Sequence, residues 1–181
     1  MNTVEPIRDK RDISAMKKYL REKDEKYYIM FITGINLGLR INEILKMTVG
    51  DVKNRTRQKF RQSKTGKEIT VAYNPELIKA YRDYCKGRTP DEALIPNNRN
   101  EYKPISRSMA YKVIREAAEH VGVENIGTHS LRKTCGYHFY RQTKDIVTLQ
   151  VWFNHRHQTD TLRYIGITGE NICNAMINFT L

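Results

Sequence analysis

Residues 27–45 read YYIMFITGINLGLRINEIL. This stretch joins the most apolar run of the chain to its first polar motif, so the fold prediction starts from it. The run covers residues 27–39 and includes Thr33, Asn36 and two glycines. A membrane-spanning helix needs about 20 apolar residues, so the run predicts a buried helix of a globular core. The predicted helix covers about residues 24–38 and ends near Gly38, a residue type suited to a left-handed C-cap. A short helix over about residues 40–47 follows at once.

Helical periodicity continues on both sides of this stretch. Asp12 is the predicted cap of a helix that extends to about residue 23. Residues 51–73 differ, because β-branched positions alternate around the turn Thr65-Gly66, which predicts a small β-hairpin or a three-stranded sheet. Helices are predicted again at residues 75–86, 106–121, 130–142, 145–153, 159–165 and 170–179. We therefore expect one domain over residues 1–181, mainly α with a small antiparallel β-sheet (α+β).

The charge balance indicates a polyanionic partner. Lys and Arg number 32 against 20 Asp and Glu, which gives a net charge of +12 and an isoelectric point of about 9.7. The excess is concentrated in residues 1–90, which hold 21 basic and 11 acidic side chains. Nucleic acid is the natural ligand of such a surface, whereas a merely solvated surface mixes the two signs.

A run of basic residues lies in the predicted β segment. Five of them occupy every second position, and an extended strand would project all five from one side. Such a ribbon can lie against DNA phosphates, although an exposed, solvated strand shows the same alternation, and part of the run can be loop. The seven basic residues of the segment, with no acidic residue between them, are Lys53, Arg55, Arg57, Lys59, Arg61, Lys64 and Lys67.

Four short signals in the chain carry chemistry, although each is weak alone. Arg40 follows the glycine stop and opens a helix, where it can reinforce an anion-binding end. A lysine lies at the hairpin turn in SKTGK, residues 63–67. His129 and Arg132 are three apart at the start of a helix and so share a face. The fourth signal is a histidine followed nine residues later by a tyrosine, His155 and Tyr164.

Taken in order, these residues form the polar set that a metal-free phosphoryl transfer requires. No acidic cluster suggests a Mg²⁺ site, so fixed cations would have to meet the phosphate charge. Arginine does this best, because its planar fork binds two phosphate oxygens and stays charged at any working pH. The three cysteines, Cys85, Cys135 and Cys173, show no CxxC spacing and are expected to be reduced thiols. We expect no cofactor and no bound metal.

The ordered set GLRINEIL (38–45), SKTGKE (63–68), THSLRKT (128–134) and His with Tyr nine residues later resembles the tyrosine recombinases. This family includes phage and conjugative-transposon integrases, Xer recombinases and fimbrial-switch invertases. The resemblance covers the chain from about Ile13 to its end. The closing TLRYIGIT (161–168) and AMINFTL (175–181) are most similar to integrases of Gram-positive mobile elements.

The resemblance implies a catalytic role for six residues. Arg40 and Arg132 would clamp the scissile phosphate, and Tyr164 would attack phosphorus to leave a 3′-phosphotyrosyl enzyme and a free 5′-hydroxyl. Three further residues would assist. Lys64 would protonate the leaving oxygen, His129 would take the tyrosine proton, and His155 would hydrogen-bond the phosphate. A seventh residue, Glu43, would support the arginine site.

The chain departs from the family pattern before the second histidine, where Phe153-Asn154 replaces the usual Leu-Gly. Asparagine tolerates the left-handed backbone that such a glycine adopts, so we expect the turn to survive. If the turn shifts, His157 becomes a rival for the role of His155. Tyr140 is the rival nucleophile, and we expect it to pack in the helix after Arg132.

The resemblance also leads to expectations about partners and context. The family usually carries an N-terminal DNA-clamping domain for which this chain has no room, so the sequence is either a trimmed catalytic domain or a naturally minimal recombinase. Double-stranded recombination sites would be the substrate, with a monomer free in solution, a tetramer on DNA, and an excisionase or DNA-bending accessory protein as possible partner. The tail, residues 169–181, would pack in cis or dock on a neighbouring subunit. We expect a cytoplasmic protein without membrane contact or signal peptide.

The predicted function is site-specific breakage and rejoining of DNA, with integration or excision of a phage or mobile element as its biological use. Inversion and chromosome-dimer resolution use the same chemistry and stay as alternatives. A DNA-binding module without catalysis is an alternative of a different class, and the complete set of six residues weighs against it.

Overall fold

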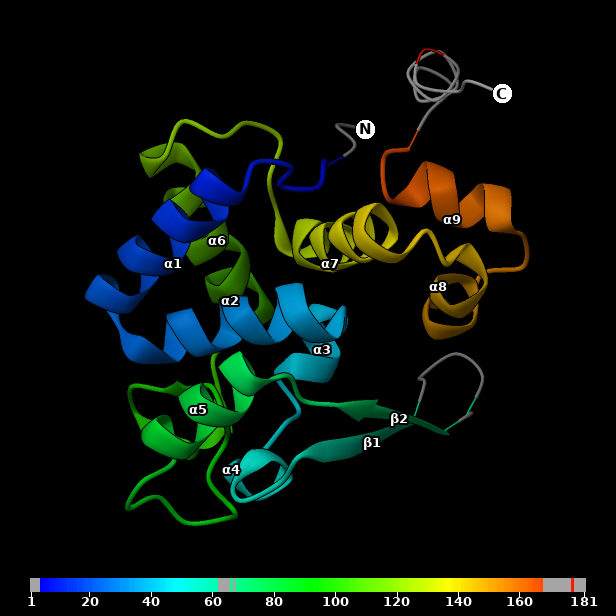
Figure 1. Cartoon of the computed structure of the whole chain (residues 1–181). Coiled ribbons are helices and arrows are strands. Elements are labelled where there is room, and N and C mark those ends of the chain that lie inside the picture. Colours follow the sequence, from blue (N-terminus) through cyan, green and yellow to red (C-terminus); the bar gives the residue numbers. More distant parts are fainter. Residues whose placement is uncertain (1–3, 62–65, 67, 168–176, 178–181) are drawn as a thin grey trace.

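The structure is a computed structural model that describes residues 4–61, 66, 68–167 and 177 (Figure 1). In this part of the chain, helices dominate and the strands form two small antiparallel pairs. The helices are α1 (Lys10–Lys23), α2 (Glu25–Leu37), α3 (Ile41–Ile44), α4 (Val49–Val52), α5 (Pro75–Tyr84), α6 (Arg107–His120), α7 (Thr128–Thr143), α8 (Ile146–Phe153) and α9 (Gln158–Tyr164). The strands are β1 (Arg57–Arg61), β2 (Glu68–Ala72), β3 (Pro96–Asn97) and β4 (Asn100–Pro104).

Helix α2 forms the centre of the fold and packs against α1, α5 and α7. Its residues from Tyr28 to Gly34 are all buried. A Cβ on Gly34 would lie 2.7 Å from the Leu131 Cδ1 atom, so only glycine lets α7 approach α2 this closely. The predicted buried helix over residues 24–38 is confirmed: Asp24 caps its start, and Gly38 ends it with a φ of 59°.

The remaining helices follow the predicted pattern, with differences at their ends. The cap of α1 is Asp9 and not the predicted Asp12, because the Asp9 side chain accepts the Arg11 backbone N–H. Helix α3 is shorter than predicted and covers only Ile41–Ile44. The prediction of a mainly α fold with a small antiparallel sheet is confirmed. The predicted helix at residues 170–179 lies, except for residue 177, outside the described residues.

The segment over residues 51–73 is less extended than the sequence predicted. It begins with the last turn of α4 and becomes a strand only at Arg57, where β1 pairs with β2 in the register Arg57↔Ala72 to Arg61↔Glu68. The prediction that five basic residues share one strand face is therefore wrong for Lys53 and Arg55. Lys53 is the C-cap of α4, and its Nζ donates to the Arg88 carbonyl at 2.7 Å. Arg55 donates from Nε to the Gly50 carbonyl at 2.8 Å.

A second, smaller apolar cluster joins α7, α8 and α9 beside the main core. Its buried members are Leu149, Phe153 and Ile165. A Cβ on Gly136 of α7 would meet both Phe153 and Ile165 at 2.7 Å, so this glycine lets α8 and α9 seat directly on α7. Because the cluster contains Phe153 and Ile165, it fixes the two segments that carry the predicted histidine and tyrosine.

Candidate active site

Arg132 is the most enclosed of the predicted site residues. It lies in the first turns of α7, only 4% of its surface is exposed, and its guanidinium lies 4.1 Å from the Phe153 ring centroid. Nη1 donates to the Gly38 carbonyl at 2.5 Å and Nη2 to the Phe153 carbonyl at 3.2 Å. These carbonyls end α2 and α8, so Arg132 ties together the segments that carry Arg40 and His155. Burial, and then the neighbouring positive charge of Arg40, lower the pKa of Arg132.

Arg40 and Glu43 form a capping box at the start of α3. The Glu43 Oε2 atom accepts the Arg40 backbone N–H at 2.7 Å, and Oε1 accepts from the guanidinium Nη1 at 3.3 Å. The Arg40 side chain is 28% exposed and the Glu43 side chain 17%, so the pair lies at the rim of the site. Glu43 thus contacts both the backbone and the side chain of Arg40, as the predicted supporting role requires.

Tyr164 is the last residue of α9 and packs against His155. Their ring centroids lie 5.1 Å apart at an interplanar angle of 67°, and Phe153 packs edge-on against both rings. The His155 Nδ1 atom lies 3.0 Å from the Thr161 hydroxyl oxygen, which holds the ring at a fixed angle. Burial raises the pKa of Tyr164, while the positive charges of Arg132 and Arg40 and a hydrogen bond to Arg132 act in the opposite direction. The arginines therefore favour the phenolate that a nucleophile needs.

His129 lies at the open side of this group, in the first turn of α7. Its side chain is exposed, but surrounding protein still partly desolvates it, and that effect lowers its pKa first. Arg107 and Arg40, followed by Lys133 and Arg132, add positive charge that lowers the pKa further. The ring is thus favoured in its neutral form, which can accept a proton. Neither Arg107 nor Lys133 was singled out from the sequence, since a lone basic residue among 32 carries no signal.

The two rival residues are His157, at the N-cap of α9, and Tyr140, on α7. His157 is exposed at the N-cap of α9 and makes no side-chain capping bond. Tyr140 packs in the small apolar cluster, and the Lys144 Nζ lies 5.5 Å from its ring centroid. The arrangement therefore favours His155 and Tyr164 for the predicted roles, and the expected packing of Tyr140 is confirmed.

The turn before His155 keeps its left-handed backbone. Asn154, the C-cap of α8, has φ 53° and ψ 49°, which confirms the expectation that the turn survives with asparagine in the place of glycine. We expect Asn154→Val to lower the free energy of unfolding by about 1–2 kcal/mol, because a β-branched residue is strained in this conformation. Asn154→Gly is the matched control and should leave stability nearly unchanged. Urea denaturation of both variants measures the difference, and equal stability of the valine variant would contradict the strain argument.

The pKa of His155 is lowered first by burial and then by the positive charge of Arg132. The unfolded chain therefore binds a proton that the folded chain does not, once the pH falls below the ordinary histidine value of about 6.5. We expect the free energy of unfolding to decrease as the pH falls from about 7 to about 5, and to decrease less in His155→Gln. Urea denaturation over this pH range measures both slopes, with His157→Gln as the control. Identical slopes in the two variants would remove His155 from this effect.

The β1–β2 hairpin approaches the site from the side of α8 (Figure 1). A small pocket lies where the hairpin, α8 and the site meet. Its charged lining residues are Arg40, Glu43 and Arg132, and its apolar lining residues are Leu39, Phe60, Ile69, Val71 and Trp152. Lys59 is exposed on β1 and available to a ligand. Lys64 and Lys67 lie outside the described residues, so their predicted roles stay predictions.

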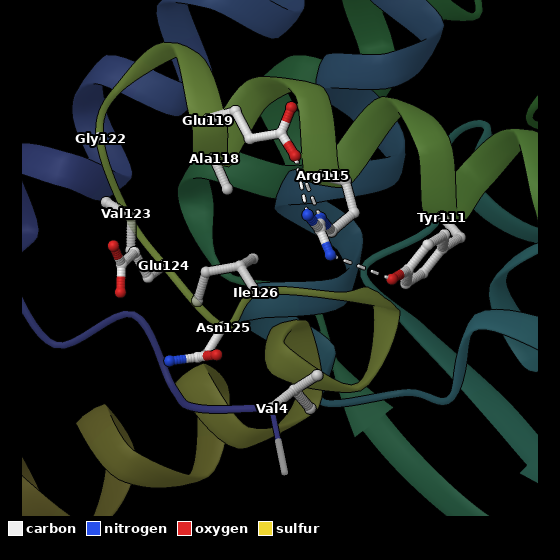
Figure 2. A pocket seen from close by; sticks show the side chains of 10 residues that line it. All are labelled: Val4, Tyr111, Arg115, Ala118, Glu119, Gly122, Val123, Glu124, Asn125 and Ile126. Carbon is white, nitrogen blue, oxygen red and sulfur yellow. Dashed lines mark hydrogen bonds and ion pairs between the residues drawn. The ribbon is translucent and has the colours of Figure 1, made fainter. Parts of the chain in front are cut away.

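A larger open groove lies elsewhere, between the end of α6, the α6–α7 loop and the N-terminal segment (Figure 2). It has a volume of about 510 Å³, and none of the predicted site residues line it. Arg115 is paired within it, to Glu119 at 2.8 Å and to the Tyr111 hydroxyl at 3.4 Å. This groove is therefore separate from the group formed by Arg40, Arg132, His155 and Tyr164. None of the described helices is both long and apolar enough to cross a membrane.

Comparison of the sequence with known proteins agrees with the family resemblance. The pattern of the phage integrase family matches residues 9–170. A probable integrase/recombinase of Bacillus subtilis, YoeC, is 45% identical over 167 residues, which cover 92% of each chain. The tyrosine recombinase XerC of Caldanaerobacter subterraneus is 27% identical, and the match covers 91% of this chain but 49% of that protein.

Solved structures share the fold. The crystal structure of XerA recombinase superimposes with a TM-score of 0.78 at 19% identity, over 98% of this chain and 67% of the other. The catalytic domain of bacteriophage HP1 integrase gives 0.64 at 18% identity, over 96% and 95%. The chain belongs to the phage integrase family of tyrosine-type site-specific recombinases.

Proposed function

We propose that this chain cleaves and rejoins double-stranded DNA through a 3′-phosphotyrosyl intermediate. The observation that carries the proposal is the convergence of Arg40, Arg132, His155 and Tyr164 from four separate segments of the chain. Two guanidiniums beside a tyrosine hydroxyl can neutralise a phosphodiester and its transition state while the phenolate oxygen attacks phosphorus. The phosphotyrosyl bond conserves the energy of the broken phosphodiester, so rejoining needs no nucleotide cofactor.

Each proton of the reaction has a proposed carrier. His129, favoured in the neutral form, accepts the proton of the Tyr164 hydroxyl as the oxygen attacks. The 5′-oxygen leaves and takes a proton from Lys64, while His155 donates a hydrogen bond to a phosphate oxygen. Rejoining reverses these transfers: the incoming 5′-hydroxyl attacks phosphorus, and the tyrosine oxygen leaves.

DNA recombination sites are the proposed substrate, and integration or excision of a phage or mobile element is the proposed biological use. The integrase/recombinase YoeC supports this use by its similarity, as does a solved structure of the Tn1549 transposon integrase in complex with DNA. Inversion stays as the alternative, since the chain is also 27% identical over 145 residues to the type 1 fimbriae regulatory protein FimE of Escherichia coli. Direction and site choice depend on DNA sequence and accessory proteins such as an excisionase.

The proposed assembly is a monomer in solution that forms a tetramer on DNA. Related structures support it, because XerH recombinase has been solved bound to a difH substrate and lambda integrase as a tetramer bound to a Holliday junction. Arg57 and Lys59, both exposed on β1, are proposed to contact phosphates next to the cleaved bond, so affinity should fall steeply with rising salt.

A nicked suicide substrate that carries the recombination site tests the proposal. Cleavage next to the nick releases a short fragment that diffuses away, so the covalent intermediate accumulates and migrates as a protein–DNA adduct on a denaturing gel. The proposal predicts an adduct with the unmodified protein. Binding without an adduct would instead support the DNA-binding module without catalysis. Affinity alone does not separate these outcomes, because both predict salt-sensitive binding.

A further inference from the structure

The N-terminal segment, residues 4–9, is held by hydrogen bonds from its backbone to α7 and to the α6–α7 loop. The Ile7 N–H donates to the Thr134 hydroxyl oxygen at 2.8 Å, and the Ile7 side chain is only 1% exposed. The Glu5 N–H donates to the Asn125 carbonyl at 2.9 Å. The segment is therefore part of the folded structure and lies at a fixed position beside α7 (Figure 1).

Lys133 connects this segment to the tyrosine of the site. Only 8% of its surface is exposed, and its Nζ donates to the Val4 carbonyl at 2.7 Å. The same Nζ lies 5.4 Å from the Tyr164 ring centroid, within the reach of about 6 Å for a cation–π interaction. Figure 2 shows Val4 beside Asn125 and Ile126 of the α6–α7 loop, so the carbonyl that orients Lys133 is itself anchored.

A second contact of the segment involves the turn that follows Tyr164. The Arg8 Nη2 lies 3.5 Å from the carbonyl of Gly166, two residues after the tyrosine. A Cβ on Gly166 would lie 2.8 Å from Arg8 Nη2 and 3.4 Å from Pro6, and its φ of 73° also favours glycine. The segment thus packs against the turn that ends α9.

We propose that Lys133 is a positioning residue for the nucleophile: held by the Val4 carbonyl, its ammonium fixes the Tyr164 ring and links the N-terminal segment to the reaction. The inference rests on the proposed function, since it takes Tyr164 as the nucleophile. The proposed role needs no contact between Lys133 and the scissile phosphate. Adjacent helical residues point about 100° apart. Arg132 therefore reaches the Gly38 and Phe153 carbonyls, while Lys133 reaches the N-terminal segment.

The charges around both groups support this role. Tyr164 faces Arg132 and Arg40, with His155 against its ring. Lys133 faces Glu5 and Arg8, besides the Val4 carbonyl, and burial lowers its pKa first. A buried ammonium is costly to maintain, and the carbonyl and the electron-rich ring face both lessen that cost. Its positive charge in turn favours the phenolate form of Tyr164.

Lys133→Met tests the proposal, because methionine keeps an unbranched, flexible side chain and removes the charge. We expect the single-turnover rate of adduct formation at saturating DNA to fall about tenfold, with unchanged DNA affinity and a rate–pH profile moved to higher pH. Lys133→Arg should recover part of the rate. Lys144→Met is the matched control, since the Lys144 Nζ lies 5.5 Å from the ring centroid of Tyr140, and it should leave the rate and the profile unchanged.

Thr134→Val tests whether the N-terminal segment acts through Lys133. It removes the acceptor of the Ile7 N–H, and we expect it to lower the rate severalfold in the unmodified protein but not further in the Lys133→Met background. Fully additive effects, or a Lys133→Met variant with the unmodified rate and profile, would overturn the proposal. Melting temperatures identify any loss that comes from unfolding.

The test of the role of Lys133 can be distinguished from the test of the proposed function. If the unmodified protein forms no adduct, the proposed function fails, and ultraviolet titration of the tyrosines still tests the contact. The Tyr164 signal is obtained as the difference from Tyr164→Phe. Lys133→Met should raise the pKa of that phenol, and an unmoved titration would overturn the role of Lys133.

Discussion

Tyr164→Phe is expected to abolish the covalent protein–DNA adduct while leaving DNA binding intact. The substitution removes one oxygen atom, which in the proposed reaction is the atom that attacks phosphorus. Tyr164 packs edge-on against Phe153 and His155, and a phenylalanine ring keeps these contacts. The fold should therefore persist. The assay is the nicked suicide substrate on a denaturing gel, together with a binding measurement at the same salt concentration.

Tyr140→Phe is the matched control for this experiment. Tyr140 lies on α7 in the same apolar cluster, so its variant removes a hydroxyl from a comparable packing environment without touching the proposed nucleophile. We expect it to form the adduct at the unmodified rate. An adduct retained in Tyr164→Phe and lost in Tyr140→Phe would reverse the assignment.

Arg132→Lys is expected to have the second largest effect, a fall in the rate of adduct formation of about 100-fold or more. The guanidinium donates to two backbone carbonyls that lie on separate segments and still faces Tyr164. A lysine ammonium carries the same charge but lacks the planar fork, so it cannot satisfy both carbonyls and a phosphate in that geometry. We also expect stability to decrease by about 1–3 kcal/mol, since a buried carbonyl is left without a donor.

Arg115→Lys is the control for the change of side chain. Arg115 lies on α6 in an exposed ion pair with Glu119, away from the predicted site. It should alter neither the rate nor the melting temperature measurably, because exposed ion pairs contribute about 0–1 kcal/mol. A full rate in Arg132→Lys, measured in folded protein, would remove the bidentate arginine from the proposed mechanism.

The long helices could be predicted from the sequence because each carries its own signal. The apolar run before Gly38, the capping aspartate at residue 24 and the asparagine at residue 154 act through neighbours in the chain. Short elements carry too few residues for a periodic pattern. Helix α4 and strands β3 and β4 have four, two and five residues, and all three were missed. The prediction that Lys53 and Arg55 lie in a strand was wrong because basic residues at every second position also occur in a turn followed by a strand.

The fold class and the set of candidate site residues, in their order, could be predicted from the sequence, since these depend on residue type, spacing and local backbone preference. Which of these residues contact one another depends on the tertiary structure. Arg132 contacts the ends of α2 and α8, His155 and not His157 packs on Tyr164, and Lys133 joins the N-terminal segment to the same ring. Most of these contacts join residues far apart in the chain, and they depend on close helix packing at Gly34 and Gly136, where any side chain would separate the helices.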